Sequence, residues 1–286
     1  MNANPWLDRR VVAFAHQGGA HEAPSSTLFA IAQAIEHGAT AIELDVHATK
    51  DRHIVVCHDA TVDRTTNAVG EICNFTLAEL REMDNAYWWI EGETVSPDHD
   101  AGDYRLRGRA PSDRSLGIAT LEEVAVKFPG VPLNMDIKRT TPEVEPYEQL
   151  LADELRRLER ADSVIVASFS DHAIQTFRSL APEFLTSAAT TETATFYFAQ
   201  REGTTPPSLP VCALQVPASF GDVRVVDEEF VAAAHHAGIA VHVWTINDLD
   251  EMATLLDLGV DGIISDRPTT LVQLLKERDC AWDGKL

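Results

Sequence analysis

Two histidines and several carboxylates stand in or at the ends of apolar runs in the first sixty residues. His16 ends the first run, Glu43 and Asp45 alternate along the second, and His58 ends the third. Such runs are typical of buried strands, in which residues two apart face the same way. Glu43 and Asp45 therefore converge on one side, beside His47, which we interpret as structural. Two carboxylates on one face need a cation between them, and their oxygens suit Mg²⁺, Ca²⁺ or Mn²⁺.

A second group of polar residues lies further along the chain. Asn134, Asp136 and Lys138 alternate along the run 132–138, Trp244 lies near the end of a later run, and Asp266 follows the last. If these strands share one sheet edge, the residues form one site. Histidines there would serve acid–base catalysis, carboxylates would bind a metal, and the lysine would bind an anion.

Each of these residues also has a structural interpretation. A histidine at a strand end is more often structural than catalytic. Glu43 and Asp45 could pair with lysine or arginine instead of a metal. Lys138 could be the counter-ion of Asp136, and Trp244 could simply pack. The functional interpretation depends on the whole set occurring together.

The elements that would position this set alternate along the chain. Leaving out the run 53–58, eight strand-like runs are mostly separated by helical patterns; they lie at 11–16, 41–46, 132–138, 163–169, 184–188, 211–216, 239–245 and 262–265. This alternation predicts an α/β fold, a (β/α)₈ TIM barrel. The link 48–52 is too short for a parallel crossover, so runs 41–46 and 53–58 should form an antiparallel hairpin. An open doubly wound sheet is the less favoured alternative, since no Gly-rich dinucleotide loop follows the first strand.

One long polar segment interrupts this rhythm after the hairpin. We predict one domain over residues 1–286, with an insertion at 60–115. Its aromatic cluster Tyr87–Trp89 is more often the core of such a lobe than a lipid-binding patch. The tail 277–286 is expected to be an exposed extension.

Composition narrows the class of protein. The 286 residues carry a net charge of −22, which argues against nucleic acid and anionic membranes as partners. Four scattered cysteines without a CxxC pair favour a reducing, cytoplasmic compartment. We also expect no signal peptide and no transmembrane segment, because no apolar run approaches about 20 residues.

The residues and motifs, taken in order, resemble the glycerophosphodiester phosphodiesterase family. The matching motifs are A-H-Q-G-G, E-A-P-S-S-T-L, G-A-T-A-I-E-L-D-V, T-K-D-R-H-I-V-V-C-H-D, D-R-T-T-N, I-A-T-L-E-E-V, L-N-M-D-I-K, A-S-F-S, V-W-T-I-N-D and G-V-D-G-I-I-S-D-R-P. The resemblance covers most of the chain. It implies a TIM barrel with an insertion after the H-D motif, in agreement with the alternation of elements.

The resemblance also implies roles for individual residues. His16 and His58 would be the acid–base pair, and Lys138 would help bind the phosphate, with Gln17 and Trp244 as further substrate contacts. The metal ligands would be Glu43, Asp45 and Asp136, holding Mg²⁺ or Ca²⁺, with Mn²⁺ as a further alternative. The substrate would be a small glycerophosphodiester, split into sn-glycerol 3-phosphate and an alcohol. The glycerol 2-hydroxyl would attack, and water would open the resulting cyclic phosphate.

The chain departs from the family pattern at three places. Gln17 replaces an arginine, Ser25-Ser26 replaces Glu-Asn, and Asp136 replaces the usual glutamate. We still expect an active enzyme, and Glu22 could supply the lost carboxylate.

Two other functions stay open at this stage. One is a lysophospholipase-D-like activity on lysolipids, with the acyl chain against the aromatic insertion. The other is a barrel that binds a phosphodiester without cleaving it. The sequence leaves open the leaving alcohol, the native metal, which histidine is the base, and the oligomeric state.

Overall fold

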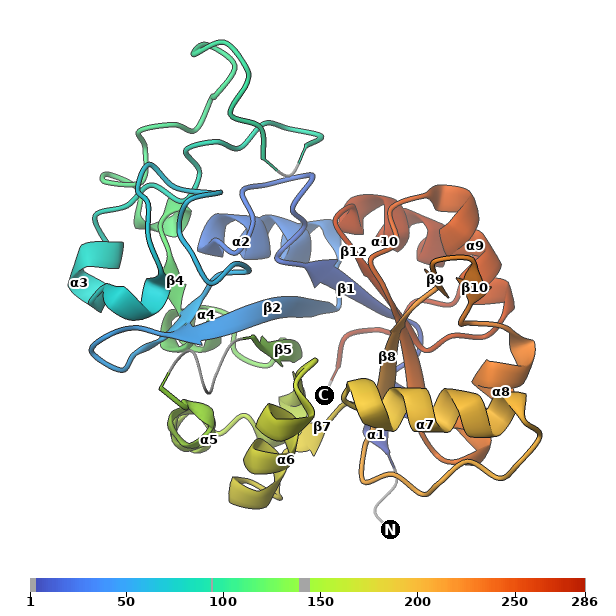
Figure 1. Ribbon diagram of the computed structural model, residues 1–286. Helices are drawn as coiled ribbons and strands as arrows, with labels where there is room; N and C mark the ends of the chain where they lie inside the picture. The colour runs from blue at the N-terminus through green and yellow to red at the C-terminus, as the bar shows by residue number, and fades with distance from the viewer. Residues whose placement is uncertain (1–3, 94, 139–144, 286) are drawn as a thin grey trace.

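Eight parallel strands form the centre of the protein in the computed structural model, which describes residues 4–93, 95–138 and 145–285 (Figure 1). The strands are β1 (Val12–His16), β2 (Ala41–Ala48), β5 (Leu133–Ile137), β6 (Val164–Ala167), β7 (Leu185–Thr186), β8 (Ala213–Pro217), β11 (Ala240–Trp244) and β12 (Gly262–Ser265). Their order is β7-β6-β5-β2-β1-β12-β11-β8, and a parallel bridge between Ser187 and Ala213 joins the two end strands. The predicted (β/α)₈ barrel is confirmed.

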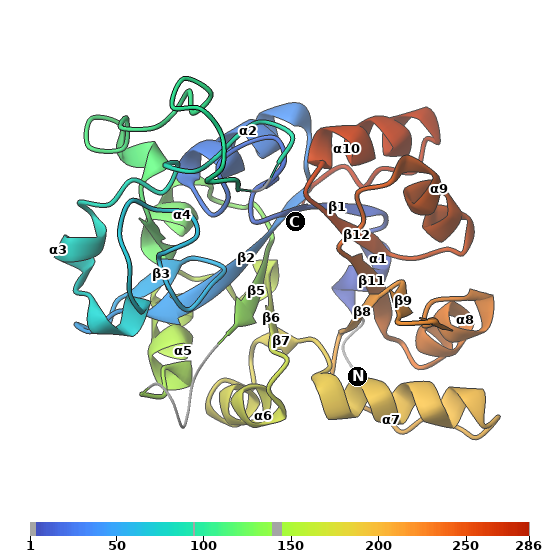
Figure 2. The same cartoon turned by 45° about the horizontal axis from the view of Figure 1, so that its top comes forward.

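Helices surround the barrel and alternate with its strands (Figures 1 and 2). They are α2 (Leu28–His37), α4 (Leu121–Lys127), α5 (Glu148–Arg157), α6 (Asp171–Leu180), α7 (Thr190–Arg201), α8 (Glu228–His236), α9 (Leu249–Asp257) and α10 (Pro268–Glu277). Helix α2 begins at Leu28, because the Thr27 hydroxyl caps it by accepting from the amide of Ala30. Among the described residues, no helix is long and apolar enough to cross a membrane.

The predicted hairpin is present beside the barrel. β3 (Ile54–Val56) runs antiparallel to β2 and pairs His47 with Val55. β4 (Ala119–Thr120) then adds to the outer edge of β3. The hairpin thus extends β2 beyond the barrel and carries His58 back toward its rim.

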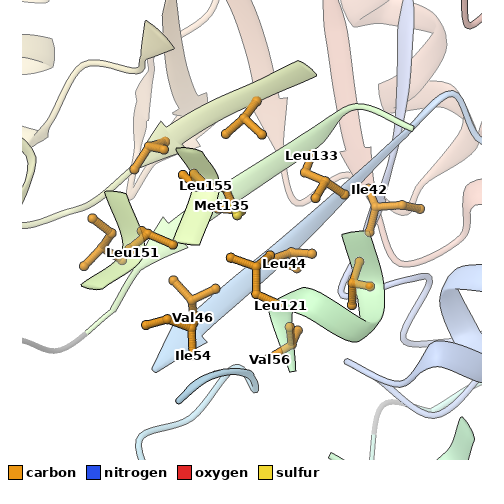
Figure 3. Close-up of a cluster of buried hydrophobic side chains, with 14 of the residues drawn as sticks. Ile42, Leu44, Val46, Ile54, Val56, Leu121, Leu133, Met135, Leu151 and Leu155 are labelled. Carbon is orange, nitrogen blue, oxygen red and sulfur yellow. The ribbon is translucent and has the colours of Figure 1, made fainter. Parts of the chain in front are cut away.

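Alternation along the strands divides the core from the site. The outward side chains of β2, β3 and β5 pack against α4 and α5 in the apolar cluster of Figure 3; they include Ile42, Leu44, Val46, Ile54, Val56, Leu133 and Met135. The intervening residues of β2, Glu43 and Asp45, must then face the barrel interior. Burial of the apolar set therefore fixes the direction of the carboxylates.

The segment between β3 and β4 contains little regular structure. It holds two short 3₁₀ helices, η1 (Ile72–Asn74) and η2 (Arg114–Leu116), and one turn of helix, α3 (Leu77–Leu80). Within it the Arg107 guanidinium lies over the rings of Tyr87, Trp88 and Tyr104 at 4.4, 4.6 and 3.5 Å. The indole of Trp88 donates to the Thr66 carbonyl. These aromatic side chains thus serve the packing of the segment itself.

Both chain ends lie at the face of the barrel formed by the amino ends of its strands. Helix α1 (Pro5–Asp8) places Trp6, which is fully buried, against Phe14. The tail following α10 is mostly exposed, as expected, but backbone hydrogen bonds attach it to the barrel. The Val11 amide donates to the Cys280 carbonyl, and the Trp282 amide donates to the Val11 carbonyl. These two hydrogen bonds hold the tail beside β1. The remaining elements are η3 (Ala161–Ser163) and a small hairpin of β9 (Ser219–Phe220) and β10 (Val223–Arg224).

The buried ring of His242 makes stability sensitive to acid. It packs between Trp6 and Phe14, and burial lowers its pKa to about 3. In the unfolded chain His242 takes up a proton near pH 6.5, whereas in the folded protein it stays neutral down to about pH 3. The contribution of the neutral buried ring to the unfolding free energy is therefore fully present above pH 6.5 and is lost as pH falls toward 3. We expect His242→Gln to remove up to about 1.4 kcal/mol per pH unit from the acid slope of the unfolding free energy, measured by urea denaturation between pH 7 and 4.

The matched control for this prediction is His236→Gln, which removes an exposed histidine from α8. It should leave the acid slope unchanged. An unchanged slope in His242→Gln would show that the buried ring does not carry the effect.

Candidate active site

Strand register brings the predicted site residues to one edge of the barrel. His16 on β1 is paired with Glu43 on β2, and Asp45 on β2 is paired with Asp136 on β5. Lys138 directly follows β5. His16, Asp136 and Lys138 lie at or next to the carboxyl ends of β1 and β5, and the register places Glu43 and Asp45 of the longer strand β2 at the same edge. This edge is the face where TIM barrels carry their active sites.

His16 lies between two carboxylates. Its Nδ1 donates to Asp266 Oδ1 at 2.7 Å, and its Nε2 lies 3.7 Å from Glu43 Oε2. Burial alone would lower the pKa of this ring, but Glu43 and Asp266 outweigh burial and raise the pKa to about 9. The Asp266 contact also fixes which nitrogen faces the site, since Nδ1 is used.

Asp266 is itself held by Asn247, a contact that the sequence analysis missed. The Asn247 side chain donates to Asp266 Oδ2 at 2.8 Å and accepts from the Asp266 amide at 2.8 Å. Burial favours the neutral acid, yet the hydrogen bonds from His16 and Asn247 keep the pKa of Asp266 below its usual value. Asn247 and Asp266 belong to the motifs V-W-T-I-N-D and S-D-R-P, but only the packing of the loops that carry these motifs brings the two side chains together.

Gln17 bends the chain immediately after β1. Its φ of 52° lies in the left-handed region, and its amide donates to the Glu43 carboxylate at 3.2 Å. Its side-chain nitrogen lies 3.1 Å from His16 Nε2. Gln17 therefore contacts the catalytic candidate directly, and it brings no charge.

His58 has a carboxylate partner of its own. Its Nδ1 donates to Asp59 Oδ1 at 2.6 Å, and the Arg64 guanidinium donates to both Asp59 oxygens at 2.6 and 3.2 Å. The hydrogen bond from His58, together with Arg64, holds the pKa of Asp59 well below its usual range. Neither Asp59 nor Arg64 is among the site residues predicted from the sequence, although the H-D and D-R-T-T-N motifs contain them.

The two histidine rings face each other across the site. Their centroids are 6.2 Å apart and their planes are nearly perpendicular, at 88°. In each ring Nδ1 is hydrogen-bonded to a carboxylate, so Nε2 is the nitrogen that can exchange a proton with a substrate. This arrangement can transfer a proton to one atom of a substrate and remove a proton from another.

Three buried carboxylates, Glu43, Asp45 and Asp136, lie beside the histidines, and two of them share one lysine. Lys138 Nζ lies 2.8 Å from Asp45 Oδ1 and 3.1 Å from Asp136 Oδ2. Burial favours the neutral amine, but Asp45 and Asp136 outweigh it and raise the pKa of Lys138. Burial, and next the charge of Asp45, raises the pKa of the Glu43 carboxyl. Burial also raises the pKa of Asp136 despite Lys138.

The donors of this cluster suit a divalent cation. Asp45 Oδ2 and Asp136 Oδ1 are buried without a hydrogen-bond partner in the described part of the chain. Such oxygens are ligands of Mg²⁺ and Ca²⁺, and a cation would relieve the repulsion felt by Glu43. As arranged here, no three His, Cys, Asp or Glu side chains of the described residues gather closely enough to hold a metal. Lys138 supplies the positive charge between Asp45 and Asp136 instead.

Other predicted residues lie around this centre. His47 is buried, its Nε2 lies 3.4 Å from the His58 carbonyl, and burial lowers its pKa to about 4, which fits a structural role. Asn134 accepts from Gln215 at 3.0 Å inside the barrel. Trp244 stacks edge to face with Phe169 at 5.5 Å.

Glu22 does not replace a lost site carboxylate. It accepts from the amide and hydroxyl of Thr269 at 3.0 and 2.6 Å, in the first turn of α10. Ser25 and Ser26 are buried, and the Ser25 carbonyl accepts from Asn85 of the inserted segment. These positions therefore anchor neighbouring elements and add no charge to the site.

The glycerophosphoryl diester phosphodiesterase family matches residues 16–270, a range that includes every element of the site. The chain belongs to this family. The resemblance seen in the motifs is confirmed, and so is the prediction of an enzyme of the phosphoric diester hydrolase class. The individual site roles remain predictions.

Full-length relatives are similar along the whole barrel. A glycerophosphodiester phosphodiesterase of Caldanaerobacter subterraneus subsp. tengcongensis is 27% identical over 94% of this chain and 99% of its own length. A glycerophosphodiester phosphodiesterase of Bacillus subtilis is 28% identical over 91% of this chain and 84% of its own.

Solved structures support the fold. A glycerophosphoryl diester phosphodiesterase domain from Mycobacterium tuberculosis superposes with a TM-score of 0.75 at 18% identity, covering 94% of this chain and 99% of that one. An Oleispira antarctica phosphodiesterase, in complex with the product sn-glycerol-3-phosphate, has a TM-score of 0.68 at 22% identity, covering 95% and 99%.

Replacing Lys138 should lower the stability of the protein, because the buried carboxylates then repel each other without a cation between them. In Lys138→Met, Asp45 and Asp136 stay buried without their cation, so we expect the unfolding free energy to fall by about 3–5 kcal/mol. If the cluster accepts a divalent cation, added Mg²⁺ or Ca²⁺ should recover part of this loss. Urea denaturation with EDTA and with each metal measures both effects.

Lys50→Met, at an exposed position after β2, is the matched control and should change stability little. A Lys138→Met protein as stable as the wild type would show that the cluster does not depend on this ion pair.

Proposed function

We propose that this protein hydrolyses glycerophosphodiesters to sn-glycerol 3-phosphate and an alcohol, with His16 and His58 as the acid–base pair. The observation that carries the proposal is the facing pair of histidines, each bound through Nδ1 to a carboxylate. Membership of the glycerophosphoryl diester phosphodiesterase family supplies the reaction class. The product complex of the Oleispira antarctica phosphodiesterase supports sn-glycerol 3-phosphate as the product here.

The proposed reaction uses the two rings in sequence. One histidine removes the proton of the glycerol 2-hydroxyl, which attacks phosphorus, while the other protonates the leaving alcohol. A cyclic phosphate forms, and water then opens it with the roles of the rings reversed. The tethered hydroxyl lowers the entropic cost of attack. Lys138 would offset the charge that develops on the phosphoryl oxygens, and Gln17 beside His16 would contribute a neutral amide contact.

A divalent ion would be held by Glu43, Asp45 and Asp136. When bound, it would supply Lewis-acid stabilisation of the phosphoryl oxygens. The two buried carboxylate oxygens without hydrogen-bond partners among the described residues support this part of the proposal. We further propose a cytoplasmic location, supported by Cys57 and Cys212, which lie in separate apolar clusters rather than together.

The first test is release of sn-glycerol 3-phosphate from glycerophosphocholine and glycerophosphoethanolamine. We expect turnover to be lost with EDTA and restored by Mg²⁺, Ca²⁺ or Mn²⁺. His16→Ala and His58→Ala should each lower kcat by about 10²–10⁴-fold. His236→Ala removes an exposed histidine and should be neutral. Metal binding retained in an inactive His58→Ala would separate catalysis from binding.

Absence of turnover with every metal would instead support a barrel that binds phosphodiesters without cleaving them. Turnover that survives both histidine substitutions would overturn the acid–base assignment while leaving the enzyme class in place.

A substrate analogue tests the nucleophile. An analogue of glycerophosphocholine without the 2-hydroxyl cannot form the cyclic phosphate, so we expect no release of choline from it. Phosphorus NMR of the natural substrate should show a transient cyclic glycerol phosphate. Choline release from the analogue at the normal rate would mean that water attacks directly.

A further inference from the structure

The loop between β1 and α2, residues 17–27, carries Gln17 at one end and Ser25-Ser26 at the other. Each end contains a residue in the left-handed region, with φ of 52° at Gln17 and 60° at Ser26. Residues other than glycine disfavour this region, so neighbouring contacts must hold the backbone there. The Ser26 amide donates to the Gln17 carbonyl at 2.8 Å, which joins the two ends of the loop directly.

The Gln17 side chain depends on this backbone for its place in the site. The Gln17 amide donates to the carbonyl and to the carboxylate of Glu43 at 3.0 and 3.2 Å, and the side-chain nitrogen lies 3.1 Å from His16 Nε2. Gln17 stands where the family pattern has an arginine, and its side-chain amide carries no charge. Such a group binds a phosphoryl oxygen only at hydrogen-bonding distance and in a suitable direction. The position of the loop therefore decides what Gln17 can contribute.

Two contacts from the inserted segment reach the middle of the loop. The Trp89 indole donates to the Ala20 carbonyl at 3.2 Å, and the Gly92 amide donates to the His21 carbonyl at 2.8 Å. Because these bonds fall on consecutive loop residues, they restrain both the position and the direction of the backbone. Figure 2 shows the inserted segment beside α2, the helix into which this loop leads.

Asn85 of the inserted segment holds the far end of the loop. Asn85 is 2% exposed, its side-chain nitrogen donates to the Ser25 carbonyl at 3.2 Å, and its side-chain oxygen accepts from the Thr65 hydroxyl at 2.6 Å. Both ends of the amide are used, which fixes its orientation. The next loop residue, Ser26, donates to Gln17, so Asn85 begins a chain of hydrogen bonds that ends in the site.

We propose that Asn85 and Trp89 are positioning residues for the reaction, which hold the 17–27 loop so that the Gln17 amide meets the phosphoryl group in the transition state. Both side chains act through carbonyl groups of the loop backbone. A displacement of about 1 Å can lower a rate about a hundredfold, so restraints outside the chemistry matter. The inference rests on the proposed phosphodiesterase function and gives the inserted segment a part in it.

Steady-state kinetics of glycerophosphocholine hydrolysis in Trp89→Phe and Asn85→Asp test the inference. Trp89→Phe removes the indole N–H and keeps an aromatic ring. Asn85→Asp keeps an acceptor for Thr65 but sets a carboxylate oxygen against the Ser25 carbonyl. We expect kcat to fall about fivefold in Trp89→Phe and about thirtyfold in Asn85→Asp, with KM changed by less than about twofold, because the lost contact is made in the transition state.

Trp88→Phe is the matched control. It removes an indole hydrogen bond of 2.9 Å to the Thr66 carbonyl, which lies within the inserted segment and not in the loop. We expect kcat to stay at the wild-type value in this variant. Equal losses of kcat in Trp88→Phe and Trp89→Phe, or no loss in either, would overturn the inference.

A double-mutant cycle shows whether Trp89 acts through Gln17. Gln17→Asn tolerates the left-handed backbone and withdraws the amide by one methylene. In this background Trp89→Phe should lower kcat by less than about twofold, because the group that Trp89 positions no longer reaches the site. The full loss, retained in the Gln17→Asn background, would contradict the proposed route.

Hydrogen exchange of the backbone amides of residues 17–27, followed by mass spectrometry, separates the inference from the proposed function. Exchange should be about fivefold faster in Trp89→Phe and Asn85→Asp than in the wild type, and unchanged in Trp88→Phe, because only the first two release the loop. Unchanged exchange in all three variants would overturn the inference whatever the activity. If no diester is cleaved with any metal, the proposed function fails and a role in the reaction fails with it, while faster exchange would still show that the inserted segment holds the loop.

Discussion

The site depends on compensating buried negative charge at the carboxyl edge of the barrel. Parallel pairing of β2 with β5 places Asp45 beside Asp136, and pairing of β1 with β2 places Glu43 beside His16. Backbone hydrogen bonding between β2 and β5 fixes Asp45 beside Asp136, so the repulsion between these two carboxylates cannot be relieved by moving the strands apart. Positive groups must enter the cluster: Lys138 lies between the two aspartates, and the His16 ring takes up charge beside Glu43. A divalent ion would compensate the same buried negative charge.

The two histidines are oriented by different structural devices. His16 depends on two loops far apart in sequence, because Asp266 and Asn247 reach it from the last strands of the barrel. His58 depends on its immediate neighbour Asp59, which Arg64 holds from five residues away. Both devices use Nδ1 and hold the carboxylate as an anion. Similar ring chemistry therefore arises from one long-range and one local arrangement, at the two sides of a single opening.

The mouth is divided by the order of strands around the barrel. β12, β1, β2 and β5 are consecutive and carry or adjoin the titratable groups, whereas the segments after β6, β8 and β11 carry exposed apolar side chains. The insertion contains the aromatic cluster that is most evident in the sequence. Its rings pack around Arg107, because a long segment with little regular structure needs a core of its own. Aromatic content in the sequence therefore did not mark the apolar surface.

The sequence by itself determined the barrel, the hairpin and the inward direction of Glu43 and Asp45, because alternation along strands is a local property that burial enforces. It also placed His16, His58 and Lys138 at strand ends. Only the tertiary structure decided that Asn247 holds Asp266, that Glu22 caps α10 instead of joining the site, and that the C-terminal tail packs beside β1. Those contacts join residues separated by up to hundreds of positions, and no periodicity in the chain encodes how its loops meet.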